Sequence, residues 1–198
     1  QKEKYVVLSE ASIAFNFDFK KLIAAHVASG ADVTMLYERR EIPQGCVNDN
    51  HTVKVQDGRV VELLTNDYRP GVQNLSMDVY IIERETLITM IQDATSRGLV
   101  YFERDILSRN LQLLNVQGME YTGYTARISD RKSYFDENMR LLQGDNLDRL
   151  FPAGQPVYTK VRDDAPTRYA MDAKAKNCMV ADGCVIEGEI ENCVLFRG

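Results

Sequence analysis

The chain has 198 residues, 44% of them hydrophobic, and a formal net charge of −5. This length is enough for one globular domain, or one and a half, with a substantial core, and an acidic chain without a basic run argues against a nucleic-acid partner. No apolar run reaches the ~18 residues of a membrane span, and no basic-then-apolar leader opens the chain, so we expect a soluble cytoplasmic protein.

Residues 1–37 predict a strand, a helix and a second strand. The continuous apolar run at residues 5–8 is typical of a central parallel strand, and residues 33–37 predict the returning strand. Between them, Asp18 is a candidate cap for a helix that ends at Gly30. The apolar face of this helix comprises Phe19, Leu22, Ile23 and Val27.

Ligands of such βαβ units bind beyond the carboxyl ends of the strands, which here means residues 9–12. The glycine-rich turn that would hold the phosphates of a nucleotide is absent from residues 1–30. A sheet that begins with a buried strand normally has other strands before it. We therefore expect the nucleotide-binding half of the domain to be missing from this sequence.

The middle of the chain alternates strands with helices. Asp57-Gly58, between strands at 52–55 and 59–64, is a strong hairpin signal. Strands are also predicted at 75–82 and 119–128, and helices at 85–94 and 103–114. Asp130 is a candidate cap for a later helix. The predicted inward stripe of this helix is Tyr134, Phe135, Asn138, Met139 and Leu142. We expect His26, Tyr121 and Tyr124 in the core and His51 in solvent.

After a linker at residues 152–176, the tail shows a period of six. One six-spaced series is Cys178, Cys184, Ile190 and Phe196, and a second is Val180 and Ile186. This period is typical of a β-helix whose triangular coils stack like residues on like, with Gly183 and Gly188 allowing corners. The alternative is a buried strand pair whose spacing is accidental. Residues 177–198 hold little more than one coil, so we expect most of the β-helix to be missing.

The four cysteines do not form a CxxC pair. Cys178, Cys184 and Cys193 lie in the six-period tail, where small apolar residues are needed, and Cys46 lies in a polar loop. We therefore predict reduced cysteines of a cytoplasmic protein rather than disulfides or a zinc site.

Several short segments, taken in order, carry a family resemblance over nearly the whole chain. They are Val7-Leu8-Ser9, Asp18-Phe19, Gly30-Ala31-Asp32-Val33-Thr34, Gly58-Arg59-Val60-Val61-Glu62, Ser76-Met77-x-Val79-Tyr80, Ser133-Tyr134-Phe135, Pro156-Val157-Tyr158-Thr159 and Asp182-Gly183-Cys184-Val185-Ile186. This order resembles the bacterial glucose-1-phosphate adenylyltransferase, or ADP-glucose pyrophosphorylase, family. The resemblance implies an α/β fold, with part of a Rossmann-like nucleotidyltransferase domain at residues 1–151 and the first coil of a left-handed β-helix at 177–198.

The resemblance also implies a reaction, in which ATP and glucose 1-phosphate give ADP-glucose and pyrophosphate. Such chemistry needs Mg²⁺ held by carboxylates, because negative charge must be neutralised as the phosphates react. Here Ala11 and Arg127 stand where the family has its two metal-binding aspartates, and a cation at position 127 repels Mg²⁺. Asn66 stands where the family has a phosphate-binding lysine.

The sugar pocket is altered as well. Asp78 replaces a glycine of the family motif and brings an anion near the sugar, while Ser76 persists and can hydrogen-bond a hydroxyl. We therefore expect no catalytic residues and no metal site in this chain, with Ser76 and Asp78 as vestigial substrate-binding residues.

These losses favour a regulatory, catalytically silent subunit that joins a catalytic subunit of the same family in a hetero-oligomer, which we expect to be a tetramer. One alternative is an active sugar-1-phosphate nucleotidyltransferase that binds Mg²⁺ through Glu10 or Asp130. The others are an unrelated hexapeptide protein and a noncatalytic interaction domain that self-associates through the open edge of its truncated β-helix.

Overall fold

The computed structural model describes residues 3–45, 51–67, 69–160 and 162–197, so the predicted reduced Cys46 lies outside the described residues. The chain forms two compact units. The first comprises Gln1–Ala11 and Asp18–Thr122, and the second comprises Ser12–Phe17 and Gly123–Gly198. Both combine helices with strands, which confirms the predicted α/β class.

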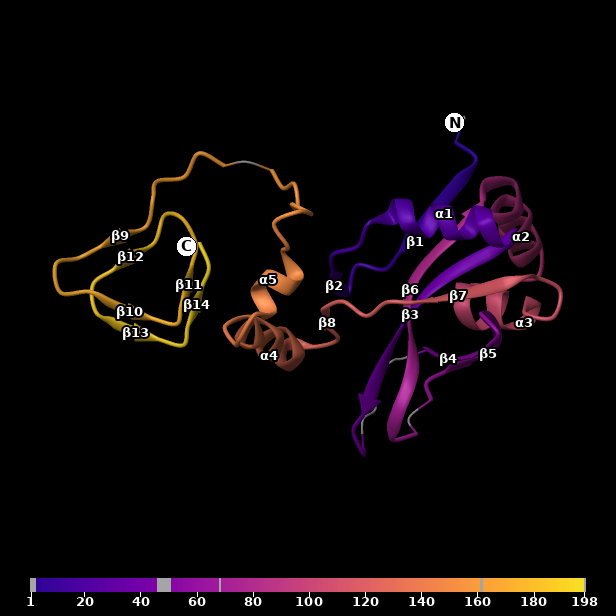
Figure 1. Ribbon diagram of the computed structural model, residues 1–198, viewed down its shortest axis with the longest axis horizontal. Helices are drawn as coiled ribbons and strands as arrows, with labels where there is room; N and C mark the ends of the chain where they lie inside the picture. The colour runs from indigo at the N-terminus through magenta and orange to yellow at the C-terminus, as the bar shows by residue number, and fades with distance from the viewer. Residues whose placement is uncertain (1–2, 46–50, 68, 161, 198) are drawn as a thin grey trace. The chain divides into compact units, whose positions relative to one another are not determined.

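The first unit is built on a six-stranded mixed sheet (Figure 1). Its strands are β1 (Tyr5–Ser9), β3 (Val33–Ile42), β4 (His51–Gln56), β5 (Arg59–Thr65), β6 (Gly71–Glu83) and β7 (Val116–Glu120). They lie in the order β1-β6-β3-β7-β5-β4, and β4 also pairs with β6 through Thr52 and Leu75, so the sheet closes on itself. The pair β3–β7 is parallel, and the other pairs are antiparallel.

The predicted central parallel strand at residues 5–8 is wrong. Within the described residues β1 pairs with β6 alone, and the pairing is antiparallel. Because β3 is also antiparallel to β6, β1 and β3 run in the same direction with β6 inserted between them. The apolar run was misleading because β1 is not buried on both faces: the side chain of Val7 remains 39% exposed.

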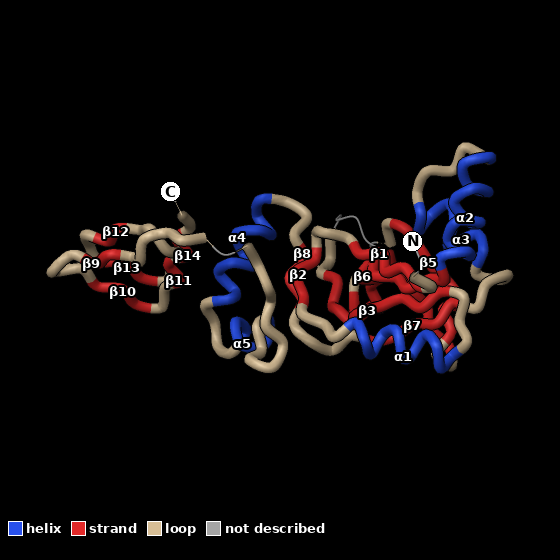
Figure 2. The backbone as a smooth tube through the Cα atoms, turned by 90° about the horizontal axis from the view of Figure 1, so that it is seen from above, coloured by secondary structure: helices blue, strands red, loops and turns tan. Residues whose placement is uncertain are grey.

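Helices cover both faces of this sheet. They are α1 (Phe19–Ser29), α2 (Arg84–Ser96), the π-helical segment η1 (Phe102–Leu107) and α3 (Ser108–Asn110). Figure 2 shows α1 on one side of the strands, with α2 and α3 on the other. The predicted ends of the first helix are confirmed, since the Asp18 side chain accepts a hydrogen bond from the Lys20 N–H and Gly30 is left-handed at φ 60°.

The larger of the described core clusters lies on the face of the sheet that η1 covers. Its fully buried members include Val33, Met35, Val60, Ile82, Leu107 and Val116. On the other face, Leu22 and His26 of α1 are buried. His26 Nδ1 lies 2.9 Å from the Thr34 hydroxyl, which confirms the prediction of a core histidine with a hydrogen-bond partner.

The predicted hairpin between β4 and β5 is confirmed. Asp57 and Gly58 have φ values of 49° and 81°, as the two central residues of a type I′ turn require.

The second unit begins with the antiparallel pair β2 (Ile13–Phe15) and β8 (Thr125–Arg127), followed by α4 (Arg131–Leu141) and α5 (Asn146–Leu150). The strand predicted at 119–128 is therefore two strands, β7 and β8, separated by residues 121–124. The predicted inward stripe of α4 is also wrong, because Tyr134 and Phe135 are 46% and 62% exposed. Glu137 is buried instead, and it pairs with Arg140 at 2.7 Å.

The tail forms two stacked turns made of short parallel strand pairs (Figure 1). The first turn contains β9 (Arg168–Tyr169), β10 (Lys174–Lys176) and β11 (Met179–Val180), and the second contains β12 (Val185–Ile186), β13 (Glu189–Glu191) and β14 (Val194–Leu195). The pairs are β9–β12, β10–β13 and β11–β14. The first turn thus includes residues 168–176 of the segment predicted as a linker.

Like residues stack on like in these turns. The side chains of Asn177 and Asn192 are hydrogen-bonded at 2.7 Å, and both residues are left-handed, at φ 50° and 52°. Gly183 forms a corner at φ 82°, as predicted. Gly188 does not need to be glycine, because its φ is not positive and no atom lies within 4 Å of the position that a Cβ would take.

Candidate functional site

The residues with the most concentrated polar contacts in the first unit are Ser76, Asp78, Tyr80 and His51, which we call the Asp78 cluster. Oδ1 of Asp78 accepts hydrogen bonds from the Ser76 hydroxyl at 2.8 Å and the Tyr80 hydroxyl at 2.9 Å. His51 Nδ1 lies 3.2 Å from the same oxygen. Ser76 and Tyr80 are each 1% exposed, so this contact set is largely shielded from water.

An irregularity in β6 creates the cluster. Met35 of β3 pairs with Tyr80 and Tyr37 pairs with Ser76, so three residues of β6 lie opposite Leu36 alone. At this bulge Asp78 takes the left-handed region, with φ 51°. Glycine adopts that conformation most easily and aspartate is among the side chains that tolerate it, which explains why a motif with glycine here can also carry aspartate.

The charges in the Asp78 cluster stabilise each other. Burial alone raises the pKa of Asp78, but the hydrogen bond and charge of His51, with the Ser76 and Tyr80 hydroxyls, outweigh it and lower that pKa to about 2. Burial lowers the pKa of His51, but the hydrogen bond and charge of Asp78, followed by the charges of Glu103 and Glu10, raise it overall. These contacts favour the protonated form of the His51 side chain, which donates a hydrogen bond to the Asp78 carboxylate.

The sequence located half of this cluster. Ser76 and Asp78 were predicted as neighbours in one pocket, and the structure brings them together, whereas the prediction that His51 is solvated is wrong because its side chain is 21% exposed and bonded to Asp78. Tyr80 was missed as a partner. The i, i+2 and i+4 spacing of Ser76, Asp78 and Tyr80 suggests one strand face, but the bulge at residues 77–79 interrupts the regular alternation, so the spacing alone could not establish the contact.

The segment with Ala11 lies beside this cluster. The Glu10 N–H donates to the carbonyl oxygen of Asp78 at 3.1 Å, directly after the β1–β6 pair of Ser9 and Val79. Ala11 itself is exposed. Glu10, the alternative metal ligand at this point, is exposed as well.

Asn66 lies at the end of β5, exposed and left-handed at φ 56°. The adjoining Asp67 is buried, and it accepts hydrogen bonds from the Thr52 hydroxyl at 2.9 Å and from Arg69 Nε at 2.8 Å. Hydrogen bonding by Arg69, aided by Thr52, lowers the pKa of Asp67 to about 2. The cation nearest in sequence to the lost lysine therefore already has an anionic partner.

The Mg²⁺ that the family reaction uses does not fit the residues at the two expected positions. The side chain of Ala11 offers no ligand atom, and Arg127, which pairs with Ile13 at the end of the β2–β8 pairing, carries a permanent positive charge. The carboxylate of Asp130, the alternative at the second position, accepts the Ser133 N–H at 2.6 Å as part of a capping box at the start of α4. Among the described residues, no three His, Cys, Asp or Glu side chains gather as a metal site would require.

Replacing Asp130 separates the roles of cap and metal ligand. We expect Asp130→Ala to lower the melting temperature of the protein and Asp130→Ser to retain most of it, because serine also caps helices but has no carboxylate. Thermal melts with and without Mg²⁺ provide the measurement. If Mg²⁺ stabilised the wild type and failed to stabilise Asp130→Ser, Asp130 would be a metal ligand and the capping role would be secondary.

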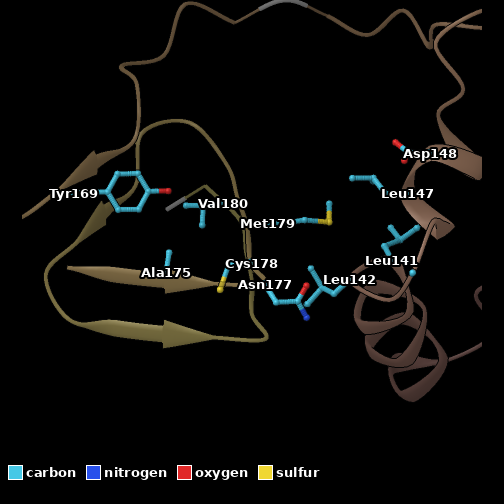
Figure 3. A pocket seen from close by; sticks show the side chains of 11 residues that line it. Leu141, Leu142, Leu147, Asp148, Tyr169, Ala175, Asn177, Cys178, Met179 and Val180 are labelled. Carbon is cyan, nitrogen blue, oxygen red and sulfur yellow. The ribbon is translucent and has the colours of Figure 1, made fainter.

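A hollow in the second unit is lined by none of the predicted site residues. Figure 3 shows Leu141, Leu142 and Leu147 from the α4–α5 segment, with Met179 and Val180 from the coil. Its lining combines these aliphatic side chains with polar groups, among them Asn177 and one carboxylate, Asp148. Separately, none of the helices in the described part of the chain is long and apolar enough to cross a membrane.

The chain is similar in sequence to two groups of curated proteins, although no family model matches it. It is 32% identical over 196 residues to the glycogen biosynthesis protein GlgD of Geobacillus stearothermophilus and 29% identical over 195 residues to that of Bacillus subtilis. It is 26% identical over 200 residues to the glucose-1-phosphate adenylyltransferase of Thermosipho melanesiensis. These alignments cover 98–99% of this chain and 47% of each relative, so the chain spans about half the length of the curated relatives it matches.

Proposed function

We propose, because this chain belongs to the ADP-glucose pyrophosphorylase family, that it is part of a regulatory and catalytically silent subunit acting in glycogen biosynthesis. The proposal rests on the residues that stand where active family members are expected to have their metal-binding and phosphate-binding side chains. Alanine and arginine replace two carboxylates, and asparagine replaces a lysine, at positions 11, 127 and 66. Each change removes charge that phosphoryl transfer requires or adds charge of the wrong sign.

The fold supports a finer assignment, which we also propose. Residues 1–151 correspond to the C-terminal half of a nucleotidyltransferase-like domain, 152–176 to a linker, and 177–198 to the start of a left-handed β-helix. The closed mixed sheet with helices on both faces and the stacked parallel strand pairs of the tail support the two domain types, and these strand pairs begin at Arg168, within the segment assigned to the linker. Ser76 and Asp78 are then the remnants of the sugar site.

We propose that the subunit works through a partner. Names of the relatives fall into two groups, glycogen biosynthesis protein GlgD and glucose-1-phosphate adenylyltransferase, and one species, Geobacillus stearothermophilus, has both. A silent member can affect the reaction by assembling with an active one, and the expected assembly is a cytoplasmic heterotetramer. The free thiols of Cys178, Cys184 and Cys193 agree with a reducing compartment.

Formation of ADP-glucose by the intact protein is the direct test. We expect the purified protein, with ATP, glucose 1-phosphate and Mg²⁺, to turn over at least ~10³-fold more slowly than an active family member, because several charge-stabilising groups are missing. Mixing it with the active member should change the rate of the mixture and yield a complex of defined mass. Turnover comparable with the active member would overturn the proposal.

Two single variants address the rival enzyme. If Glu10 or Asp130 binds catalytic Mg²⁺, then Glu10→Ala or Asp130→Ala abolishes the Mg²⁺-dependent formation of ADP-glucose by the protein alone. If the subunit is silent, neither variant has such activity to lose. The stability effect of Asp130→Ala, described above, is measured in parallel so that unfolding is not mistaken for loss of catalysis.

A further inference from the structure

The donors of the Asp78 cluster converge on one point. Ser76 and Tyr80 of β6 and His51 of β4 lie 2.8, 2.9 and 3.2 Å from Oδ1 of Asp78. Hydrogen bonds to a carboxylate oxygen are charge-assisted and therefore strong, and here two hydroxyls and a ring nitrogen of His51 lie within hydrogen-bond distance of one such oxygen. Such a set defines a preformed position for an anionic oxygen, whichever molecule supplies that oxygen.

The Asp78 cluster is partly exposed to solvent. The side chains of Asp78 and His51 are 14% and 21% exposed, whereas Ser76 and Tyr80 are 1% exposed. The solvent-accessible part of the cluster is therefore contributed by Asp78 and His51, and the two hydroxyls are buried. In the wild-type chain the carboxylate of residue 78 already fills the place that an external small molecule would take.

The scaffold does not depend on the carboxylate of Asp78. The residue is left-handed at φ 51°, which glycine adopts without strain. Its other bonds are made by the backbone, since its N–H donates to the Ser76 hydroxyl at 3.0 Å and its carbonyl accepts from the Glu10 N–H at 3.1 Å. Removing the side chain should therefore empty the oxygen position and leave the surrounding strands in place.

We propose that Ser76, Tyr80 and His51 form a binding site for a small carboxylate, and that Asp78 occupies this site from within the chain. An internal group has a high effective concentration, so an external carboxylate does not compete with it in the wild type. The ligand class follows from the group that the site holds in this chain, because a small carboxylate presents the same kind of oxygen to the same three partners as Asp78 does. This inference goes beyond the proposed silence of the subunit, and the two can fail separately, because binding of a carboxylate involves neither nucleotide nor ADP-glucose.

The test uses Asp78→Gly in the intact protein, with formate as the probe. We expect Asp78→Gly to melt below the wild type, since His51 loses its carboxylate partner and the hydroxyls of Ser76 and Tyr80, which are 3.2 Å apart, lose that carboxylate and keep each other as partners. Sodium formate should then raise the melting temperature of Asp78→Gly by ~3 °C over sodium chloride of equal ionic strength, with saturation as the site fills. The wild type should show no difference between the two salts.

Two further variants make the result specific. Asp78→Asn is the matched control, because it removes the charge but still fills the position with an amide oxygen, and formate should not stabilise it. Ser76→Ala combined with Asp78→Gly removes one donor, and the formate effect should fall at least several-fold. An equal formate effect in the wild type and Asp78→Gly, or an undiminished effect in the double variant, overturns the proposal.

Refolding covers the case in which Asp78→Gly does not fold on its own. The variant is then unfolded in urea and diluted into formate or into chloride. A higher yield of folded protein in formate supports the site, because the ligand supplies the missing acceptor. Equal yields in the two salts overturn the proposal.

Discussion

Replacing Leu107 by alanine is expected to lower the free energy of unfolding by about 2–5 kcal/mol. Leu107 is the last residue of η1, and its side chain is fully buried in the core cluster that also contains Val33, Ile82 and Val116. Alanine would remove buried methyl groups and leave a cavity that a closed sheet cannot collapse to fill, because the additional pairing of β4 with β6 closes the sheet on itself. Urea denaturation of the protein measures the change.

Leu113→Ala is the matched control for this experiment. It makes the same chemical change six residues later, but the Leu113 side chain is 82% exposed. Its effect should stay within ~0.5 kcal/mol, as for surface substitutions in general. Similar losses in the two variants would contradict the packing of η1 against the sheet.

The stability that Asp78 contributes is expected to depend on pH in two opposite ways. The folded pKa of Asp78 is about 2 against an ordinary value of 3.8, so its contribution is present above pH ~4 and is lost as the pH falls toward 2. The pKa of His51 is raised from 6.5, so its contribution is complete below pH ~6.5 and is lost as the pH rises through the folded value. The pair is therefore most stabilising between about pH 4 and 6.5, by about 2 kcal/mol on the acid side.

The measurement is the difference in unfolding free energy between the wild type and Asp78→Asn, from pH 3 to 9. This difference should form a plateau between the two limits and decrease on both sides. His51→Gln should remove the decrease at high pH, because glutamine does not titrate. Asp136→Asn, at an exposed pair with Lys132, is the control and should change stability by at most ~0.5 kcal/mol at any pH. A flat difference for Asp78→Asn would show that the carboxylate and the imidazolium do not interact.

Local signals predicted the fold better than long-range ones. Asp18, Gly30 and Asp57-Gly58 each fix a cap or a turn through their own backbone, and the structure has those elements where the sequence placed them. The direction of β1 could not be predicted, because it depends on β6, more than sixty residues away in the chain. The same limit applies to α4, where Glu137 is buried and paired with Arg140 while Phe135 is exposed.

The candidate site was predicted in part for a related reason. Ser76 and Asp78 are close in sequence and were grouped from a motif, whereas His51 reaches the same carboxylate from β4. Its position depends on the closure of the sheet, which no local pattern encodes. The bulge that turns Asp78 toward its neighbours was also invisible, since strand alternation alone does not reveal where extra residues are inserted.

The stacked asparagines of the tail limit how this part of the protein can change in length. Asn177 and Asn192 are fifteen residues apart, and the neighbouring ion pairs of Lys174 with Glu189 and Lys176 with Glu191 keep the same interval. Deleting one residue within a turn would place lysine beside asparagine and break all three contacts at once. Natural insertions and deletions here should therefore come in whole turns, whereas a surface loop can gain or lose single residues.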